Sequence, residues 1–221
     1  MINEIKKELS SKSNQEQAKI LSRFFKTGKG EYGEGDEFLG IKVPETRKIA
    51  EKYSNADLDE IQILLESKIH EERLCALLIL VKQYENKKTS DEEHKKIFEF
   101  YLKNAEKVNN WDLVDLTAPK IAGTYLFEHK ELIHLLEELA ESKNIWKQRI
   151  SILATHYFIK KKKYEQTLKI AEKFLEHEND LIHKATGWML RETGKQNLRI
   201  EEEFLKKNYK KMPRTMLRYA I

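Results

Sequence analysis

Four residues in the second half of the sequence combine types that suit chemistry on a cationic group. They are Trp111, Asp115, Arg149 and Trp188. Asp115 stands between the apolar residues Val114 and Leu116, where a carboxylate without a partner is costly to bury. An ionised carboxylate and the faces of indole rings both attract positive charge, so this set predicts a site that stabilises a cation. The ordinary alternative is that the tryptophans pack in a core and that Arg149 only pairs with a carboxylate.

A weak internal repeat predicts that these four residues lie together. Three segments can be superposed with Arg73, Arg149 and Lys184 in register: HEERLCALLIL from His70, IWKQRISILAT from Ile145 and LIHKATGWMLR from Leu181. Val114 fits the missing position, and the intervals are then 41, 35 and 35 residues, near the roughly 40-residue period of HEAT and armadillo units. The four residues fall at −3, +1, 0 and +4 in this frame, on one face of a helix. Since equivalent helices of successive repeats lie side by side, their side chains are expected to converge on one strip of surface.

The elements that must position these residues are predicted to be helices. Apolar residues recur at spacings of three and four along most of the chain, which is the helical pattern. Helix starts are indicated by Ser13 with Glu16, Ser90 with Glu93, Pro44 and Pro213. The one long irregular segment is a glycine-rich loop at residues 28–43, with five of the eight glycines. We therefore expect one all-α domain over residues 1–221, a HEAT-like α-solenoid of stacked antiparallel helix pairs with a concave binding face.

Composition excludes several classes of protein. The 221 residues are 35% charged and 40% hydrophobic, with only 8 Gly and 3 Pro, which argues against disorder. The single cysteine, Cys75, cannot form an internal disulfide and favours a reducing compartment. The longest apolar run, residues 74–81, is too short to cross a bilayer, and the charged start of the chain is not a secretory signal. We expect no membrane association and a cytoplasmic location.

Motifs for cofactor chemistry are not found. The histidines include no HExxH, and one cysteine cannot supply a thiolate cluster, so no metal site is predicted. The glycine-rich loop lacks the Gly-Lys-Ser/Thr of a phosphate-binding loop, and there is neither a dinucleotide fingerprint nor a serine nucleophile elbow. The sequence therefore predicts no cofactor.

The charge is distributed unevenly along the chain. The net charge is +4, with −1 in residues 1–110 and +5 in residues 111–221. An electropositive second half suits a polyanion. The alternative is that a lysine run such as residues 160–163 only caps a helix end, where positive charge favours the dipole.

Five segments carry a resemblance to a known family. They are FLGIKVPETRKIA (38–50), NNWDLVDLTAPKIAG (109–123), NIWKQR (144–149), HKATGWMLRETGK (183–195) and MPRTMLRYAI (212–221). These segments resemble those of the AlkD-type DNA alkylation repair family and occur in the same order. The resemblance extends from about residue 20 to the end of the chain. The resemblance implies a bacterial or archaeal DNA glycosylase with HEAT-like repeats that removes positively charged N3- and N7-alkylated purines from double-stranded DNA. It further implies no metal or cofactor, a monomer, and a damaged base that stays within the duplex.

The resemblance also assigns roles to individual residues. Asp115 matches the catalytic carboxylate, Trp111 and Trp188 match the pair that contacts the deoxyribose of the lesion, and Arg149 matches a residue that contacts the DNA backbone. These are the residues that the repeat selects. Tyr32 lies nearest the place of an N-terminal aromatic that assists DNA contact. Further candidates for DNA binding are the basic residues Lys184, Arg191, Lys195, Arg214 and Arg218.

A function from another class stays open at this point. Many helical solenoids bind nucleic acid or protein without catalysis. A carboxylate that faces a polyanion favours the enzyme, since a pure binder gains nothing from a charge that repels phosphates. Base release that depends on Asp115 would distinguish the two.

Overall fold

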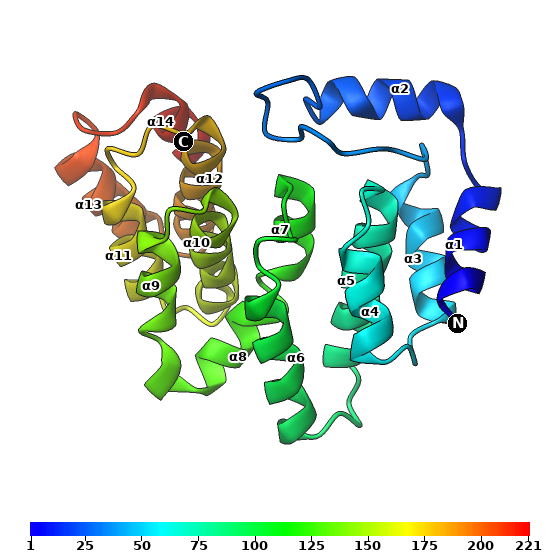
Figure 1. The fold of residues 1–221 in the computed structure, drawn as a ribbon. Helices are drawn as coiled ribbons and strands as arrows, with labels where there is room; N and C mark the ends of the chain where they lie inside the picture. The colour runs from blue at the N-terminus through cyan, green and yellow to red at the C-terminus, as the bar shows by residue number, and fades with distance from the viewer. The chain divides into compact units, whose positions relative to one another are not determined.

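The computed structural model describes residues 1–221, which form fourteen α-helices and one 3₁₀ turn, with no strand (Figure 1). The only extended pairing is an isolated bridge between Glu37 and Ile69. The chain divides into two compact units, Met1–Leu113 and Val114–Ile221. The expected single domain stays a prediction. No helix is long and apolar enough to span a membrane.

The first unit is built around α5 (His70–Tyr84). Its other helices are α1 (Ile2–Ser11), α2 (Gln15–Phe24), α3 (Val43–Lys52), α4 (Leu58–Leu65) and α6 (Asp91–Lys103). Helices α3, α4, α1 and α6 all pack on α5, and every residue of α5 from His70 to Val81 is buried. In contrast, α2 has no buried residue. Helix α7 (Trp111–Thr117) begins in this unit and ends in the next.

The second unit contains two rows of helices. In the first row, α10 (Ile145–Lys160) packs on α12 (Asp180–Gln196), which packs on α14 (Arg214–Ala220). In the second row, α9 (Leu135–Glu141) packs on α10 and on α11 (Glu165–Lys173), which also contacts α12. Helices α8 (Ala122–Glu128) and α13 (Leu198–Asn208) complete the unit. The prediction of an all-helical solenoid-type stack, in which equivalent helices lie side by side, is confirmed; the concave binding face stays a prediction.

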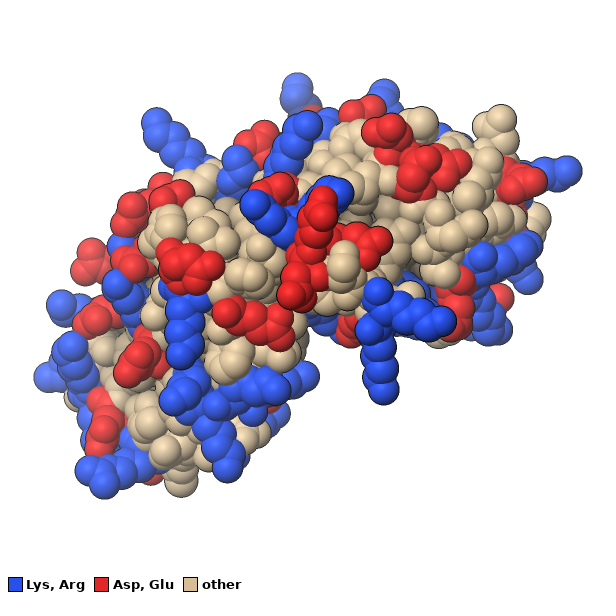
Figure 2. Space-filling view, turned by 90° about the horizontal axis from the view of Figure 1, so that it is seen from below, with Lys and Arg blue, Asp and Glu red and all other residues tan.

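Ion pairs on the surface link the helices of the second row. Lys169 and Lys173 of α11 pair with Glu137 and Glu141 of α9, and Lys207 of α13 pairs with Glu172 of α11. Figure 2 shows one face of the molecule, on which acidic and basic side chains are interspersed. Exposed pairs of this kind contribute at most about 1 kcal/mol each, so burial of the apolar residues of α10 and α12 is the main stabilising contribution.

Most of the predicted helix starts are found, with one error. Ser90 and Glu93 form a complete capping box at α6, and Pro44 lies in the first turn of α3. Pro213 lies one residue before α14. The prediction for α2 was wrong: its cap is Asn14 rather than Ser13, and the Asn14 side chain accepts a hydrogen bond from the Gln17 N–H.

The glycine-rich loop is irregular, as predicted, and crosses the start of α5. It has positive φ at Gly30, Gly35 and Gly40. Gly40 is also closely packed, since a Cβ there would lie 2.1 Å from the carbonyl oxygen of Asn14. Its backbone is tied to α5, because the Glu71 carboxylate accepts hydrogen bonds from the N–H groups of Leu39, Gly40 and Ile41. The loop is therefore held in place despite its glycine content.

The close packing of α12 on α14 depends on Gly187. A Cβ at this position would lie 2.4 Å from the carbonyl oxygen of Met216. Gly187→Ala is expected to lower the free energy of unfolding by about 1–3 kcal/mol, because the two helices must separate. Urea denaturation measures this change. In the control Gly28→Ala the new Cβ meets only the flexible Glu31 side chain, and a change within about 0.5 kcal/mol is expected. Equal losses in both variants would contradict the packing argument.

Candidate functional site

Asp115 and Arg149 form a bidentate ion pair in the second unit. Nε of Arg149 donates to Oδ1 of Asp115 and Nη2 donates to Oδ2, each at 2.9 Å. The remaining terminal nitrogen, Nη1, donates to the carbonyl oxygen of Leu181 at 2.5 Å. Arg149 therefore ties α7 to the start of α12. This geometry fixes the plane of the Asp115 carboxylate, because two parallel hydrogen bonds permit little rotation.

The two partners differ in exposure. The Asp115 side chain keeps 18% of its surface exposed, whereas that of Arg149 keeps 5%. The carboxylate can thus be reached from solvent, while the guanidinium lies behind it with its donors directed to Asp115 and Leu181. The pairing gives Arg149 a positioning role. A direct DNA contact by Arg149 stays a prediction.

Trp188 lies on α12, the neighbour of the helix that carries Arg149. It is partly exposed, and its Nε1 donates to Glu192 at 3.1 Å. Its ring lies 5.9 Å from the ring of His156 on α10. Burial raises the pKa of Glu192, but hydrogen bonds from Lys195 and Trp188 outweigh this effect and leave that pKa below its usual value. Glu192 is therefore ionised at neutral pH and orients the indole.

Trp111 is the first residue of α7 and is held by aromatic residues of the first unit. Its Nε1 donates to the Tyr32 hydroxyl at 3.2 Å. The Phe25 ring stacks on the indole with centroids 5.3 Å apart, and the Phe24 ring meets it edge-on at 5.9 Å. Asp115 follows one turn later on the same helix face, as the repeat predicts.

Phe24 is a candidate that the sequence reasoning missed. Its side chain is 61% exposed at the end of α2, next to Trp111, while Tyr32 is partly buried and bonded to Trp111. An exposed aromatic ring with the cations Arg23 and Lys26 close by in the sequence is well suited to contact a nucleic acid. The sequence signal was the pair of adjacent phenylalanines at the end of an apolar stripe, of which a helix can bury only one.

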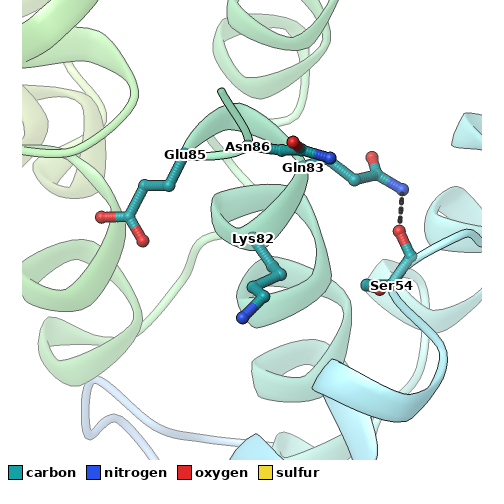
Figure 3. A pocket seen from close by; sticks show the side chains of 5 residues that line it. All are labelled: Ser54, Lys82, Gln83, Glu85 and Asn86. Atoms are coloured by element: carbon teal, nitrogen blue, oxygen red, sulfur yellow. Dashed lines mark hydrogen bonds between the residues drawn. The ribbon is translucent and has the colours of Figure 1, made fainter. Parts of the chain in front are cut away.

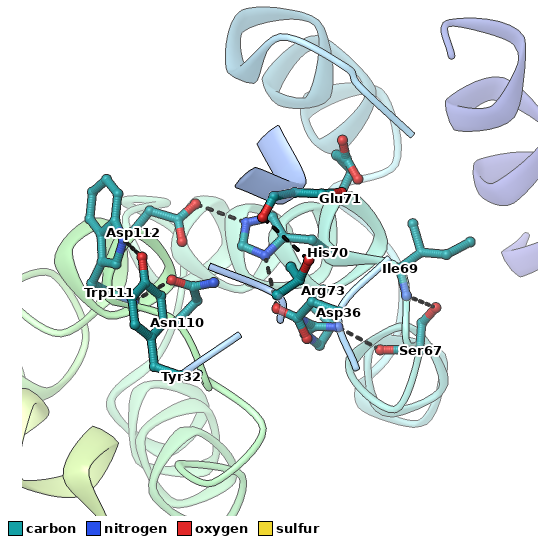
Figure 4. A network of polar contacts seen from close by, with 12 residues as sticks. Tyr32, Asp36, Ser67, Ile69, His70, Glu71, Arg73, Asn110, Trp111 and Asp112 are labelled. Carbon is teal, nitrogen blue, oxygen red and sulfur yellow. Dashed lines mark hydrogen bonds and ion pairs between the residues drawn. The ribbon is translucent and has the colours of Figure 1, made fainter. Parts of the chain in front are cut away.

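A buried polar cluster next to Trp111 was also missed (Figure 4). Nε2 of His70 lies 2.9 Å from Oδ2 of Asp112, and its Nδ1 lies 3.7 Å from Oδ2 of Asp36, which also pairs with Arg73 at 2.7 Å. Burial by itself lowers the pKa of His70, but the two carboxylates outweigh it and raise that pKa to about 9. His70 is therefore an imidazolium at neutral pH.

The predicted DNA-binding cations differ in their exposure and in whether they already form an ion pair. Lys184 pairs with Asp180 and Lys195 pairs with Glu192, each at 2.7 Å, and Arg191 is partly buried. Arg214 and Arg218 are exposed on α14 and are not among the ion-paired residues. These two arginines are therefore the most available of the set.

The cavity in Figure 3 does not coincide with these residues. It has about 430 Å³ and is lined by Ser54, Lys82, Gln83, Glu85 and Asn86, at the end of α5 opposite to His70. Gln83 donates to the carbonyl oxygens of Ser54 and Ala56, which is a structural role. In the whole chain, no group of three or more His, Cys, Asp or Glu side chains is placed to hold a metal ion.

Comparison with known proteins identifies the family. Residues 5–221 match the family described as "DNA alkylation repair enzyme". The chain belongs to this family. Its members are enzymes of DNA alkylation repair, and the resemblance inferred from the sequence motifs is confirmed. No curated protein matches the chain.

Solved structures show the fold of the DNA alkylation repair family in this chain. A predicted DNA alkylation repair enzyme from Enterococcus faecalis has 20% identity and a TM-score of 0.74, with 95% of both chains covered. The smu.31 protein of Streptococcus mutans UA159 has 16% identity and a TM-score of 0.59, with 92% of this chain and 96% of that chain covered. AlkD2 from Streptococcus mutans has the same identity and TM-score, with 92% and 95% covered.

Proposed function

We propose that this protein is a DNA glycosylase that releases N3- and N7-alkylated purines, such as 3-methyladenine and 7-methylguanine, from duplex DNA. The observation that supports it best is the Asp115 carboxylate, which is fixed by Arg149 and partly exposed to solvent. Membership of the DNA alkylation repair family supports DNA as the substrate.

The chemistry of the lesion explains why one carboxylate can suffice. A purine alkylated at N3 or N7 carries a positive charge, so the electron pair of the breaking C1′–N9 bond leaves with the base and neutralises it. No proton is needed on the leaving group. Positive charge then grows on the deoxyribose, and an ionised Asp115 stabilises this charge more in the transition state than in the ground state.

Water completes the reaction. Its oxygen bonds to C1′, and its proton passes to the solvent, directly or by way of the carboxylate. Asp115 can align this water because its plane is fixed by Arg149. An unmodified purine would leave as an anion and has no acid to protonate it, so it stays attached even when the DNA is bound.

The tryptophans contribute by binding the cation. An indole face attracts a cation by about 0.5–2 kcal/mol, depending on desolvation. Trp111 is oriented by Tyr32 and Phe25, and Trp188 by Glu192. Two oriented rings favour a positively charged lesion or sugar over a neutral one, which adds to the selectivity that the leaving group provides.

Base release is the direct test. Duplex DNA with a single N7-methylguanine is incubated with excess protein, and the free base is measured by chromatography. Release well above the spontaneous rate is expected, without added metal or cofactor. Salt-dependent DNA binding without release would contradict the glycosylase and favour the non-catalytic module.

Arg214 and Arg218 are proposed to bind DNA phosphates. Each phosphate contact contributes about −0.9 to the slope of log K against log salt concentration, so Arg214→Ala/Arg218→Ala is expected to make the slope shallower by about 2. Fluorescence anisotropy with undamaged duplex at several salt concentrations measures it. The control is Arg199→Ala/Lys206→Ala, which removes the same charge from residues already paired with glutamates. Equal slopes in both double variants would place the DNA track elsewhere.

A further inference from the structure

The Trp111 indole has two contacts with the segment between α2 and α3, in addition to the edge-on contact with Phe24 at the end of α2. The Tyr32 hydroxyl accepts its Nε1 hydrogen bond, and the Phe25 ring stacks on its face. The Phe25 ring also lies 5.0 Å from the imidazole of His70, and Phe38 stacks on both Phe25 and His70. Phe25 thus contacts both Trp111 and His70.

His70 is also the polar link between the two segments that meet at Trp111. Its Nε2 bonds to Asp112, the residue after Trp111 on α7, and its Nδ1 faces Asp36, four residues after Tyr32 in the glycine-rich loop. One cation therefore faces a carboxylate from each segment. Without that charge Asp36 would keep Arg73 as a positive partner, whereas Asp112 would lose the cation with which it pairs.

The backbone of the loop is held separately from this side chain. The His70 N–H donates to the Glu37 carbonyl oxygen at 2.8 Å, and Glu71 binds three backbone N–H groups of residues 39–41. None of these bonds uses the His70 side chain. The backbone of the loop is therefore held on α5 without the imidazole.

We propose that His70 is a positioning residue for Trp111: its imidazolium joins Asp36 of the glycine-rich loop to Asp112 of α7 and so fixes the indole between Tyr32 and Phe25. The inference rests on the role proposed above for Trp111 in base release. It adds a residue outside the reacting groups that sets the orientation of one of them.

The charge of His70 makes the arrangement sensitive to pH. The charged groups that face it are Asp36 from the loop, Asp112 from α7 and Arg73 from its own helix, and its ring contacts the rings of Phe25 and Phe38. Its folded pKa of about 9 lies above the ordinary pKa of histidine, about 6.5. The charge of His70 therefore contributes its full stabilisation of the folded state below about pH 6.5, and this contribution is lost as the pH rises through about 9.

The test is fluorine NMR of the full chain labelled with 5-fluorotryptophan. The chain has three tryptophans, so Trp146 and Trp188 of the second unit serve as internal references. In the wild type, the Trp111 resonance is expected to shift with a midpoint near pH 9, while the other two do not follow it. A Trp111 resonance that is constant from pH 7 to 10 would overturn the proposal, and this measurement needs no variant.

The variant His70→Gln provides a second test by the same fluorine NMR measurement. It keeps an N–H donor for Asp112 but not the charge, so the Trp111 resonance is expected to move at pH 7 and its titration to disappear. The matched control is His94→Gln: His94 lies on α6 and is bonded to the Tyr84 carbonyl oxygen at the end of α5, so its replacement should leave Trp111 unchanged. If His70→Gln does not fold, Asp36→Asn replaces it. A Trp111 resonance identical to that of the wild type would count against the proposal.

Base release separates this inference from the proposed function. With N7-methylguanine DNA, His70→Gln is expected to lower single-turnover release by about ten- to a hundredfold, the effect of a misplaced reacting group, with unchanged affinity for undamaged DNA. Unchanged release together with a shifted Trp111 resonance would overturn the positioning role. If the wild type itself releases no base, the proposed function fails while the fluorine spectra still decide whether His70 orients Trp111.

Discussion

Replacing Asp115 by asparagine is expected to reduce single-turnover release of 7-methylguanine by at least about 10²–10³-fold, the usual effect of removing one preorganised electrostatic group from a reaction centre. Asparagine has nearly the same shape and still accepts a hydrogen bond from Arg149, but it has no negative charge to oppose the charge on the sugar. Rapid-quench sampling with excess protein measures the chemical step directly.

The same substitution that slows base release should not weaken DNA binding. Asp115 is partly exposed and negatively charged, so it repels the phosphates that surround it in a complex. Asp115→Asn is therefore expected to bind undamaged duplex as tightly as the wild type or more tightly. Tighter binding combined with slower release is the signature of a group that acts in the transition state.

A matched control exists in the same unit. Asp180 on α12 pairs with Lys184, and its side chain is 56% exposed. Asp180→Asn makes the same change of charge without touching Arg149, and release at the wild-type rate is expected. If both variants retained full release, the catalytic carboxylate would have to be sought among other acidic residues.

The stack of helices and the pairing of Asp115 with Arg149 could be predicted because they are periodic. The repeat places charged residues in register, and the structure pairs each of them with an aspartate: Arg73 with Asp36, Arg149 with Asp115 and Lys184 with Asp180. The repeat placed Asp115 and Arg149 on neighbouring helices, and the structure pairs them; the three aspartates come from a loop, a neighbouring helix and the same helix, so they do not themselves establish the register. The repeat did not show that Arg149 would be buried behind the carboxylate.

The cluster around His70 could not be predicted in this way. Asp36 lies in a loop without periodicity, and its contact with Arg73 depends on how the glycine-rich loop crosses α5. The sequence showed only that charged residues precede the apolar run of α5. Which of them would be buried, and with which partner, is decided by contacts between distant segments.

The start of α2 shows the same limit on a smaller scale. Ser13 and Asn14 are both good caps, and the spacing of Ser13 to Glu16 suggested the first of them. In the structure the Asn14 N–H donates to the carbonyl oxygen of Leu39 at 2.8 Å. This bond to the glycine-rich loop determines where the chain turns into the helix, so a tertiary contact selects between two locally equivalent caps.

Replacing Arg149 by methionine is expected to lower the free energy of unfolding by about 3 kcal/mol, because the mostly buried Asp115 carboxylate loses its counter-charge. The Leu181 carbonyl oxygen also loses a donor. Urea denaturation followed by circular dichroism measures the change. The matched control is Arg199→Met, an exposed arginine paired with Glu203, for which a change within about 0.5 kcal/mol is expected.

A double variant distinguishes stability from catalysis. Arg149→Met/Asp115→Leu removes both charges, and replacement of a buried pair by apolar residues is often neutral or stabilising. The double variant is therefore expected to recover much of the stability that Arg149→Met loses, yet to release no base, because the carboxylate is absent. The double variant could instead lose more free energy of unfolding than the two single variants lose together. In that case the broken ion pair would not be the reason for the loss in Arg149→Met. Recovery of folding without recovery of release would show that Arg149 is retained to hold a charge that the reaction needs and the fold does not.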